Sequence, residues 1–177
     1  MSDTLSAPKS PHPPDLDPEA EAEAALDDVV DARMENRDFS NGRYLGSSLR
    51  RVELHLCRLT GAELAEATWT DVTVTDCRLD LAGMRHATLE RVVFRDCNLD
   101  EIDLAAARLK DVLFERCRLR AAMLVGATGD RLELVACELE GLDGVEVLRG
   151  ARMHWADVVE NAALFARAVG IELVEDA

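Results

Sequence analysis

Large apolar residues recur at every fifth position along most of this 177-residue chain. Eighteen consecutive fifth positions, from Phe39 to Leu124, hold such a side chain, and from Val52 onward a smaller apolar residue stands two places before each. A period of five fits neither the 3.6-residue period of a helix nor the strict alternation of a long strand. Each unit is therefore predicted to be a short extended stretch followed by a corner, with both apolar residues pointing inward.

A period of twenty encloses the period of five. Its clearest markers are the five cysteines of the chain: Cys57, Cys77, Cys97, Cys117 and Cys137. Self-similarity at a fixed spacing is typical of a solenoid, whose repeats bury their apolar positions only against their neighbours. Four five-residue units per twenty residues predict a coil with four equal sides. The expected fold class is an all-β solenoid.

Several five-residue segments resemble the repeats of pentapeptide repeat proteins, in which a small residue is followed by Asp or Asn, Leu or Phe, a polar residue and a small or polar one. The segments are Cys57–Gly61, Ala62–Glu66, Cys97–Glu101 and Ile102–Ala106. The match extends over about residues 32 to 144. This resemblance implies a right-handed quadrilateral β-helix with four repeats per coil. The matched length, at twenty residues per coil, corresponds to about five to six coils, stacked about 4.8 Å apart.

The two ends depart from the repeat. Residues 1–18 contain all five prolines and no apolar periodicity, and are predicted to be a disordered tail. Residues 19–31 are predicted to be an acidic helix or lead-in, starting after Pro18. The solenoid is assigned to residues 32–147, with Gly129 and Gly144 in slots where the pattern demands a large apolar residue.

Residues 148–177 are predicted to cap the last coil. Apolar residues between Trp155 and Val169 follow helical spacing, Gly170 suits the position after a helix end, and residues 171–174 read as a terminal strand. Such a C-terminal capping α-helix would cover the open backbone edge and the exposed core of the final coil.

Composition adds limits on location. No apolar run approaches the eighteen residues of a membrane span, and the N-terminus lacks the basic and apolar segments of a signal peptide. An odd number of cysteines argues against a disulfide framework. We therefore expect a soluble, single-domain, cytoplasmic protein with reduced thiols.

The cysteine column is the sharpest candidate for chemistry. Stacked coils would aim the five thiols in parallel, so four of them would not converge on a tetrahedral zinc ion, and the geometry is unsuited to disulfides. Cysteine is also a common small residue of protein cores. We therefore interpret the column as structural core and expect neither metal nor cofactor.

Catalytic constellations are not evident in the sequence. The four histidines, His12, His55, His86 and His154, fall in the tail, on two different sides of the coil and near the terminal helix. None is placed to activate a nucleophile with a third orienting group. We expect a protein that is not an enzyme.

The net charge of −15 is concentrated at the ends: residues 1–31 carry −8, residues 145–177 carry −3, and the solenoid between them carries −4. Within the coils, Asp71, Arg91, Asp111 and Arg131 alternate in sign one coil apart, which predicts cross-strand ion pairs. The negative field argues against direct binding of nucleic acid, despite the partial basic column of arginines at 58, 78 and 118.

Outward apolar positions and the terminal helix are the candidate interfaces of the chain. Outward slots carry apolar residues at Val93 and Leu113, one coil apart, and at Met123 and Val125; these indicate either an interface or harmless variation. Phe165 lies on the apolar stripe of the terminal helix, which two cap regions of a homodimer could share. The resemblance implies a non-enzymatic, bacterial protein-interaction scaffold with an unidentified protein partner. As an alternative, it implies a DNA-mimicking protein that binds DNA gyrase or topoisomerase IV and protects against quinolones or related toxins, as members that dimerise through their C-terminal ends do.

Overall fold

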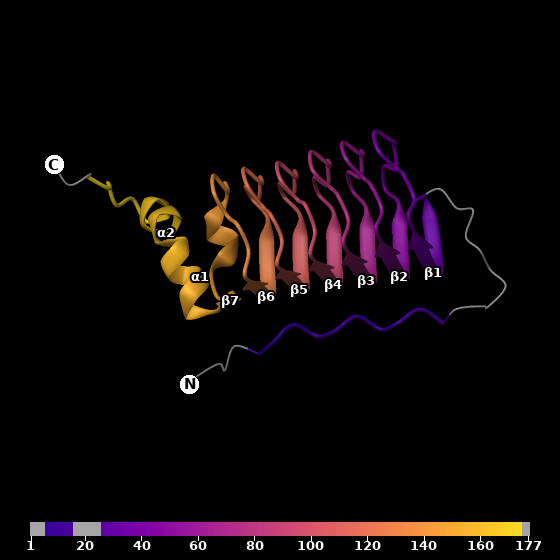
Figure 1. Ribbon diagram of the computed structural model, residues 1–177, viewed down its shortest axis with the longest axis horizontal. Coiled ribbons are helices and arrows are strands. Elements are labelled where there is room, and N and C mark those ends of the chain that lie inside the picture. The colour runs from indigo at the N-terminus through magenta and orange to yellow at the C-terminus, as the bar shows by residue number, and fades with distance from the viewer. Residues whose placement is uncertain (1–5, 16–25, 175–177) are drawn as a thin grey trace.

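The computed structural model describes residues 6–15 and 26–174, and they form a rod of stacked coils with short helices at one end (Figure 1). Within these ranges each coil contributes one eight-residue strand: β1 (Asp28–Glu35), β2 (Ser48–His55), β3 (Thr68–Thr75), β4 (Thr88–Arg95), β5 (Arg108–Glu115) and β6 (Thr128–Val135). A two-residue strand, β7 (Arg152–Met153), completes a parallel sheet in the order β1 to β7. The chain is a parallel β-solenoid of about six turns, as predicted.

Each residue of β1 to β5 that pairs with the following strand meets the residue twenty positions later, as Val52 meets Val72. The fourth residue of each of these strands is left out of the pairing and has a positive φ, such as +58° at Asp71 and +54° at Arg91. This residue is the corner between two sides of the coil. The other two sides are linked by single bridges, as between Arg58 and Arg78 and between Glu63 and Gly83. The prediction of short extended stretches joined by corners is confirmed.

The inward pairs fill the tube completely. Residues of both sizes, such as Leu64, Ala67 and Trp69, are 0% exposed. Identical positions stack on one another along the rod, and the rings of Phe94 and Phe114 lie parallel with centroids 5.2 Å apart. Stacking of like on like explains why the period of twenty is kept so strictly in the sequence.

The solenoid begins earlier than the sequence pattern indicates. For residues 19–31 the sequence predicts an acidic helix or a lead-in. A helix is wrong at the C-terminal end of this range, because Asp28 to Asp31 belong to β1; residues 19–25 lie outside the described ranges. Val29 is 4% exposed and pairs with Leu49, and Leu26 is fully buried. Pairing with the next coil therefore outweighs the local helix preference of this acidic stretch.

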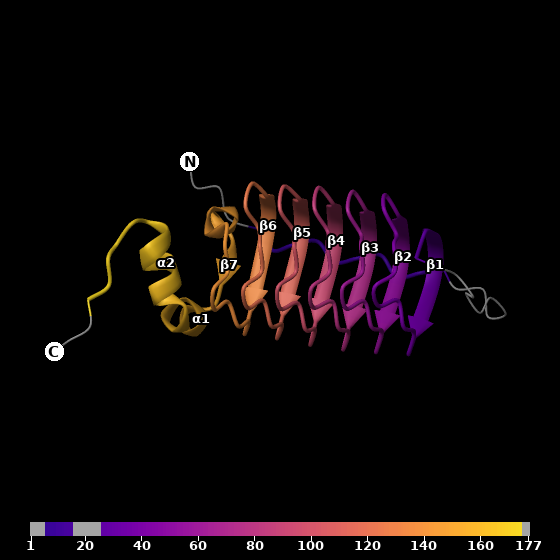
Figure 2. The same cartoon turned by 90° about the horizontal axis from the view of Figure 1, so that it is seen from above.

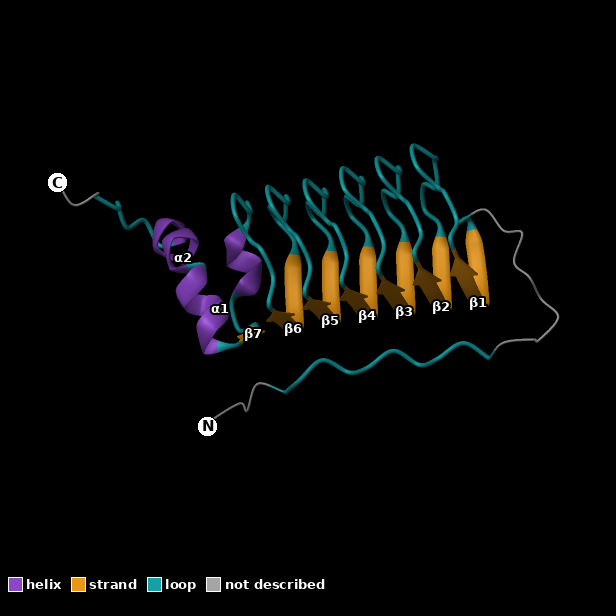
Figure 3. Ribbon diagram, in the orientation of Figure 1, coloured by secondary structure: helices purple, strands orange, loops and turns teal. Residues whose placement is uncertain are grey.

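Residues 6–15, assigned from the sequence to a disordered tail, lie as an extended segment along the outside of the coil stack. Figures 1 and 3 show this segment, which we call the strap, running across the strands from the β6 end of the rod toward β1. Its contacts with the solenoid are described below.

The C-terminal part consists of a 3₁₀-helix, η1 (Val145–Leu148), β7 and two short helices, α1 (Trp155–Glu160) and α2 (Ala162–Ala168). The sequence predicts one helix here, but Asn161, with φ −99° and ψ 15°, separates two. The predicted terminal strand over 171–174 has no strand structure. Figure 2 shows both helices at the end of the rod beyond β7.

The two glycines in large-residue slots have a physical reason. At Gly129, a Cβ atom would lie 2.6 Å from Leu132 Cδ1 and 2.8 Å from the backbone oxygen of Val147, so the side chain of Leu132 and the start of the cap fill the slot. At Gly144, φ is +83° and a Cβ would lie 2.3 Å from the backbone of Leu124. The chain turns away from the coil at that point and enters η1.

Replacing Gly129 by Leu, which restores the repeat, is expected to destabilise the protein by about 1–3 kcal/mol, because the added side chain overpacks a filled site. Thermal or urea unfolding measures the change. The matched control is Gly83→Ala, where a Cβ would have nothing within 4 Å, and where we expect a change within about 0.5 kcal/mol. A stabilised Gly129→Leu variant would show that the slot is vacant.

Candidate interaction surfaces

The five cysteines stack as buried, free thiols. Each thiol donates to the carbonyl two residues before it, as Cys97 Sγ does to Arg95 O at 3.2 Å and Cys77 Sγ to Thr75 O at 3.2 Å. Contact with Cys117, together with burial, raises the pKa of the Cys137 thiol. A buried thiol with a raised pKa is a poor nucleophile. The hydrogen bond with Cys77 instead lowers the pKa of Cys57, at the other end of the column, to about 7. All five cysteines are at most 6% exposed. The column therefore contributes packing to the core.

The corner residues of the strands form a column of alternating aspartates and arginines. They are Asp31, Arg51, Asp71, Arg91, Asp111 and Arg131. Each arginine holds the aspartate one coil earlier through two parallel hydrogen bonds; from Arg91 to Asp71 they measure 2.6 and 3.0 Å, and from Arg131 to Asp111 2.6 and 2.7 Å. The cross-strand ion pairs expected from the alternating signs are confirmed.

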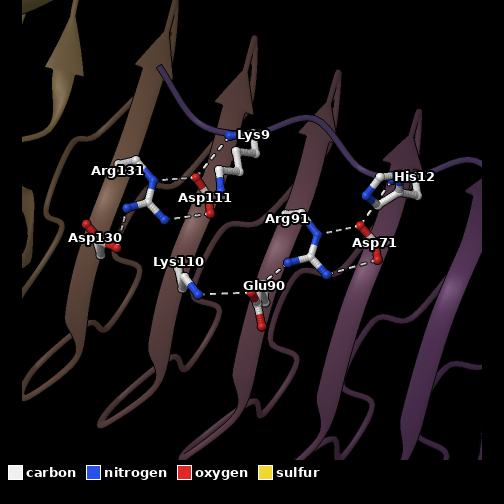
Figure 4. A network of polar contacts seen from close by, with 9 residues as sticks. All are labelled: Lys9, His12, Asp71, Glu90, Arg91, Lys110, Asp111, Asp130 and Arg131. Carbon is white, nitrogen blue, oxygen red and sulfur yellow. Dashed lines mark hydrogen bonds and ion pairs between the residues drawn. The ribbon is translucent and has the colours of Figure 1, made fainter. Parts of the chain in front are cut away.

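A second row of charges lies beside this column (Figure 4). Glu90 accepts hydrogen bonds from Lys110 at 3.0 Å and from Arg91 at 2.6 Å, and Asp130 pairs with Arg131 at 2.8 Å. Much of the acidic charge on this face is thus neutralised by neighbours. A mimic of the phosphate backbone of DNA would present unpaired acidic rows instead.

The aspartates of the corner column, Asp31, Asp71 and Asp111, are defined here as the aspartate row. Each accepts one backbone N–H from the strap: Lys9 donates to Asp111 at 3.0 Å, His12 to Asp71 at 3.0 Å and Asp15 to Asp31 at 3.1 Å. Sequence reasoning missed this contact, which joins residues up to 102 positions apart.

Electrostatics keep the aspartate row ionised. The guanidinium groups of Arg131 and Arg51 lower the pKa values of Asp111 and Asp31 to about 2, and the strap N–H groups act in the same direction. Burial alone would raise the pKa of Asp71, but Arg91 and the N–H of His12 outweigh it and lower that pKa. All three carboxylates are therefore strong hydrogen-bond acceptors at neutral pH.

The apolar residues proposed as interfaces are placed unequally. Val93 is only 9% exposed, and Leu113 is half-buried, so this pair offers little free surface. Met123 and Val125 are 42% and 49% exposed on the rod. Phe165, on α2, is half-buried and packs against the core cluster.

The cap closes the last backbone edge with a side chain. In earlier coils, the N–H at the second corner donates to a carbonyl of the next coil, as Arg116 N does to Val135 O at 2.8 Å. The corresponding N–H of Ala136 has no further coil, and it donates to Asp157 Oδ2 at 3.0 Å instead. Asp157, on α1, is 8% exposed. A carboxylate therefore replaces the missing carbonyl, a role that spacing in the sequence does not reveal.

The outer surface of the cap is markedly apolar. Trp155, Val159 and Val169 are 80%, 54% and 75% exposed. A groove of about 390 Å³ opens between η1 and α2, and its lining includes Val169, Leu148, Met153 and Phe165. Large exposed apolar surfaces on soluble domains commonly mark contacts with other macromolecules.

Within residues 6–15 and 26–174, no three His, Cys, Asp or Glu side chains gather as a possible metal site. The same ranges contain no helix long and apolar enough to cross a membrane. His55, one of the four histidines weighed for catalysis, lies 3.7 Å from Asp76 in an exposed pair on the rod.

Comparison with known proteins agrees with this fold. Residues 67–143 match the family model described as the pentapeptide repeat region, which confirms the resemblance drawn from the repeats. No curated protein sequence matches the chain.

Three solved structures illustrate the similarity. QnrB1, a plasmid-mediated fluoroquinolone resistance protein, in a trypsin-treated variant, is 12% identical over 81% of this chain and 98% of its own, with a TM-score of 0.30. A pentapeptide repeat protein from the Arabidopsis thaliana thylakoid lumen is 17% identical over 75% of each chain, with a TM-score of 0.34. HetL from Nostoc, involved in heterocyst differentiation regulation, is 16% identical over 72% of this chain and 90% of its own, with a TM-score of 0.23. Identities this low say nothing of function.

Removing the acceptor that closes the last edge is expected to weaken the cap. Asp157→Ala removes the carboxylate that accepts the N–H of Ala136. We expect a loss of about 1.5–3 kcal/mol in unfolding experiments, the range for a hydrogen bond to a charged group. Asp157→Asn keeps an acceptor oxygen and is expected to recover most of that stability. Equal losses in the two variants would show that the charge, and not the edge hydrogen bond, is what matters.

Proposed function

We propose that this pentapeptide repeat protein is a non-enzymatic scaffold that binds other proteins and associates with a second copy of itself through its C-terminal cap. The observation that carries the proposal is the exposure of large apolar side chains in the cap, where Trp155, at the start of α1, and Val169, just after α2, are 80% and 75% exposed. A face of this kind at the end of a rod suits end-to-end pairing, because a two-fold axis brings the same surface of both copies together.

The rest of the molecule supports a binding role over a catalytic one. The tube is filled by its own side chains, so reactive groups do not converge in its interior. Five free thiols suit a reducing compartment such as the cytoplasm of a bacterium. Met123 and Val125 offer a smaller apolar area along the rod for the unidentified protein partner.

Self-association predicts a melting temperature that rises with protein concentration and a dimer in analytical ultracentrifugation, since binding stabilises by mass action. Trp155→Glu places a charge in the proposed interface and is expected to give a monomer with weakened concentration dependence. Because Trp155 is 80% exposed, its replacement should leave the fold intact.

The matched control is Val125→Glu, which places the same charge on an exposed residue of the rod and should remain dimeric. A wild type that sediments as a monomer at high micromolar concentration would contradict the dimer. Dissociation by Val125→Glu and not by Trp155→Glu would move the interface from the cap to the side of the rod.

The alternative function, binding DNA gyrase or topoisomerase IV as a DNA mimic, has less support. The net charge is −15, but the aspartates of the corner column each hold an arginine. A gyrase supercoiling assay with and without a quinolone tests it directly. We expect no protection of gyrase from the quinolone at concentrations where the protein is fully dimeric. Protection that increases with the protein concentration would favour the alternative.

A further inference from the structure

Every third residue of the strap donates a backbone hydrogen bond to the solenoid. The donors to the aspartate row are Lys9, His12 and Asp15, and each directly follows a proline. Those prolines, Pro8, Pro11 and Pro14, are half-buried, whereas the other described residues of the strap are exposed. Residues three apart share one edge of a polyproline II helix, so this pattern indicates a polyproline II strap with its proline edge against the coils.

The acceptors of these hydrogen bonds recur at every second coil. Aspartates occupy the corner at every second coil, because the coils between them carry the arginines that pair with them. Two coils span about 9.6 Å along the rod. Three residues of polyproline II span about 9.3 Å. The two lengths agree closely enough for three successive donors to meet three successive acceptors.

An aspartate–arginine pair alone does not attract the strap, as one such pair at a neighbouring corner shows. Arg116 holds Asp96 through two hydrogen bonds of 2.7 Å, at a corner whose φ of +54° is close to the +58° of Asp71. No strap hydrogen bond to Asp96 is present among the described residues. Its side chain is 36% exposed, against 24%, 8% and 1% for Asp31, Asp71 and Asp111. The strap therefore lies on the column in which aspartates recur at every second coil, and not on this single pair.

We propose that the aspartate row is a binding site for extended, proline-rich peptides that present a backbone N–H at every third residue, and that residues 8–15 are its resident ligand. Recognition rests on the main chain and on spacing, since each aspartate accepts an N–H and the prolines supply the preformed conformation. The proposal is independent of the cap dimer, because the strap lies along the side of the rod and the cap closes its C-terminal end.

The resident ligand binds in cis. The strap runs from the coil of Asp111 back to the coil of Asp31, which is the first coil of the rod, so its C-terminal end arrives where the solenoid begins. Tethering gives such a ligand an effective concentration in the millimolar range. A peptide from another protein must therefore compete with the strap, so the strap acts as an intramolecular inhibitor of the site.

Amide hydrogen exchange in the full-length chain tests the spacing. We expect Lys9, His12 and Asp15 to be protected and Ser10, which has no partner on the row, to exchange freely. Inserting one glycine between Ser10 and Pro11 lengthens one step to four residues, and exchange at Lys9 should speed up about tenfold or more while Asp15 stays protected. The control is the same glycine inserted between Ser6 and Ala7, which precedes all three donors and keeps their spacing, and it should change none of the three.

Each outcome decides the matter, because the solenoid amides report independently that the variants are folded. Unchanged protection of Lys9 in the Ser10 insertion would overturn the spacing rule. Asp71→Asn should accelerate exchange at His12, since a neutral amide is a weaker acceptor, whereas Asp96→Asn should not. Equal effects of these two substitutions would show that the strap is held by general charge.

Binding in trans tests the site itself. The probe is a fluorescent peptide of residues 6–15, added to the wild-type chain and to a full-length variant with glycines inserted after both Ser10 and Pro13. With its own strap out of register, the variant is expected to bind the probe at least tenfold more tightly. A peptide of equal composition whose prolines are moved off the three-residue spacing should bind neither protein. Equal binding of both peptides would leave charge as the cause and would refute the proposed site.

Discussion

The constraint on which this structure depends is the parallel stacking of coils at a fixed offset of twenty residues. Val52, Val72, Val92 and Val112 are paired directly along the sheet. Because neighbouring coils are parallel and in register, each position of one coil lies beside the same position of the next coil, about 4.8 Å away. Apolar positions therefore become continuous core columns, while charged positions become continuous surface columns. A column of one sign would repel itself, and alternation between aspartate and arginine removes that repulsion.

The same constraint creates a difficulty at the ends, where a coil has a neighbour on one side only. At the C-terminal end the sequence gives up the repeat: Gly144 lets the chain leave the coil, and Asp157 returns from α1 to accept the last N–H. The helices that provide this acceptor bury little of their own apolar surface, as Trp155 shows at 80% exposure. One short segment therefore both closes the edge and exposes large apolar side chains, which links the cap's structural role to the proposed dimer.

The repeats made the coil predictable because each side buries one large and one small residue, and that demand is local and periodic. Ion pairs such as Arg91 with Asp71 were predictable for the same reason, since residues twenty apart must be neighbours. The early start of the solenoid was not, because the acidic stretch before Val29 favours a helix locally and only pairing with Leu49 decides against it. The division of the terminal helix at Asn161 and the inward turn of Asp157 likewise depend on contacts with the last coil.

The strap marks the boundary of what one sequence reveals. Its prolines at 8, 11 and 14 show a period of three, and the aspartates at 31, 71 and 111 show a period of forty, but nothing in the sequence relates the two. They become commensurate only through lengths in space, because three residues of polyproline II match the rise of two coils. A composition rich in proline is typical of disorder when a segment has no partner. Here the solenoid supplies acceptors at the required spacing, so main-chain hydrogen bonds and half-buried prolines hold a segment that has no apolar periodicity. Low complexity and specific recognition are compatible wherever a repeat protein offers a surface as periodic as the peptide.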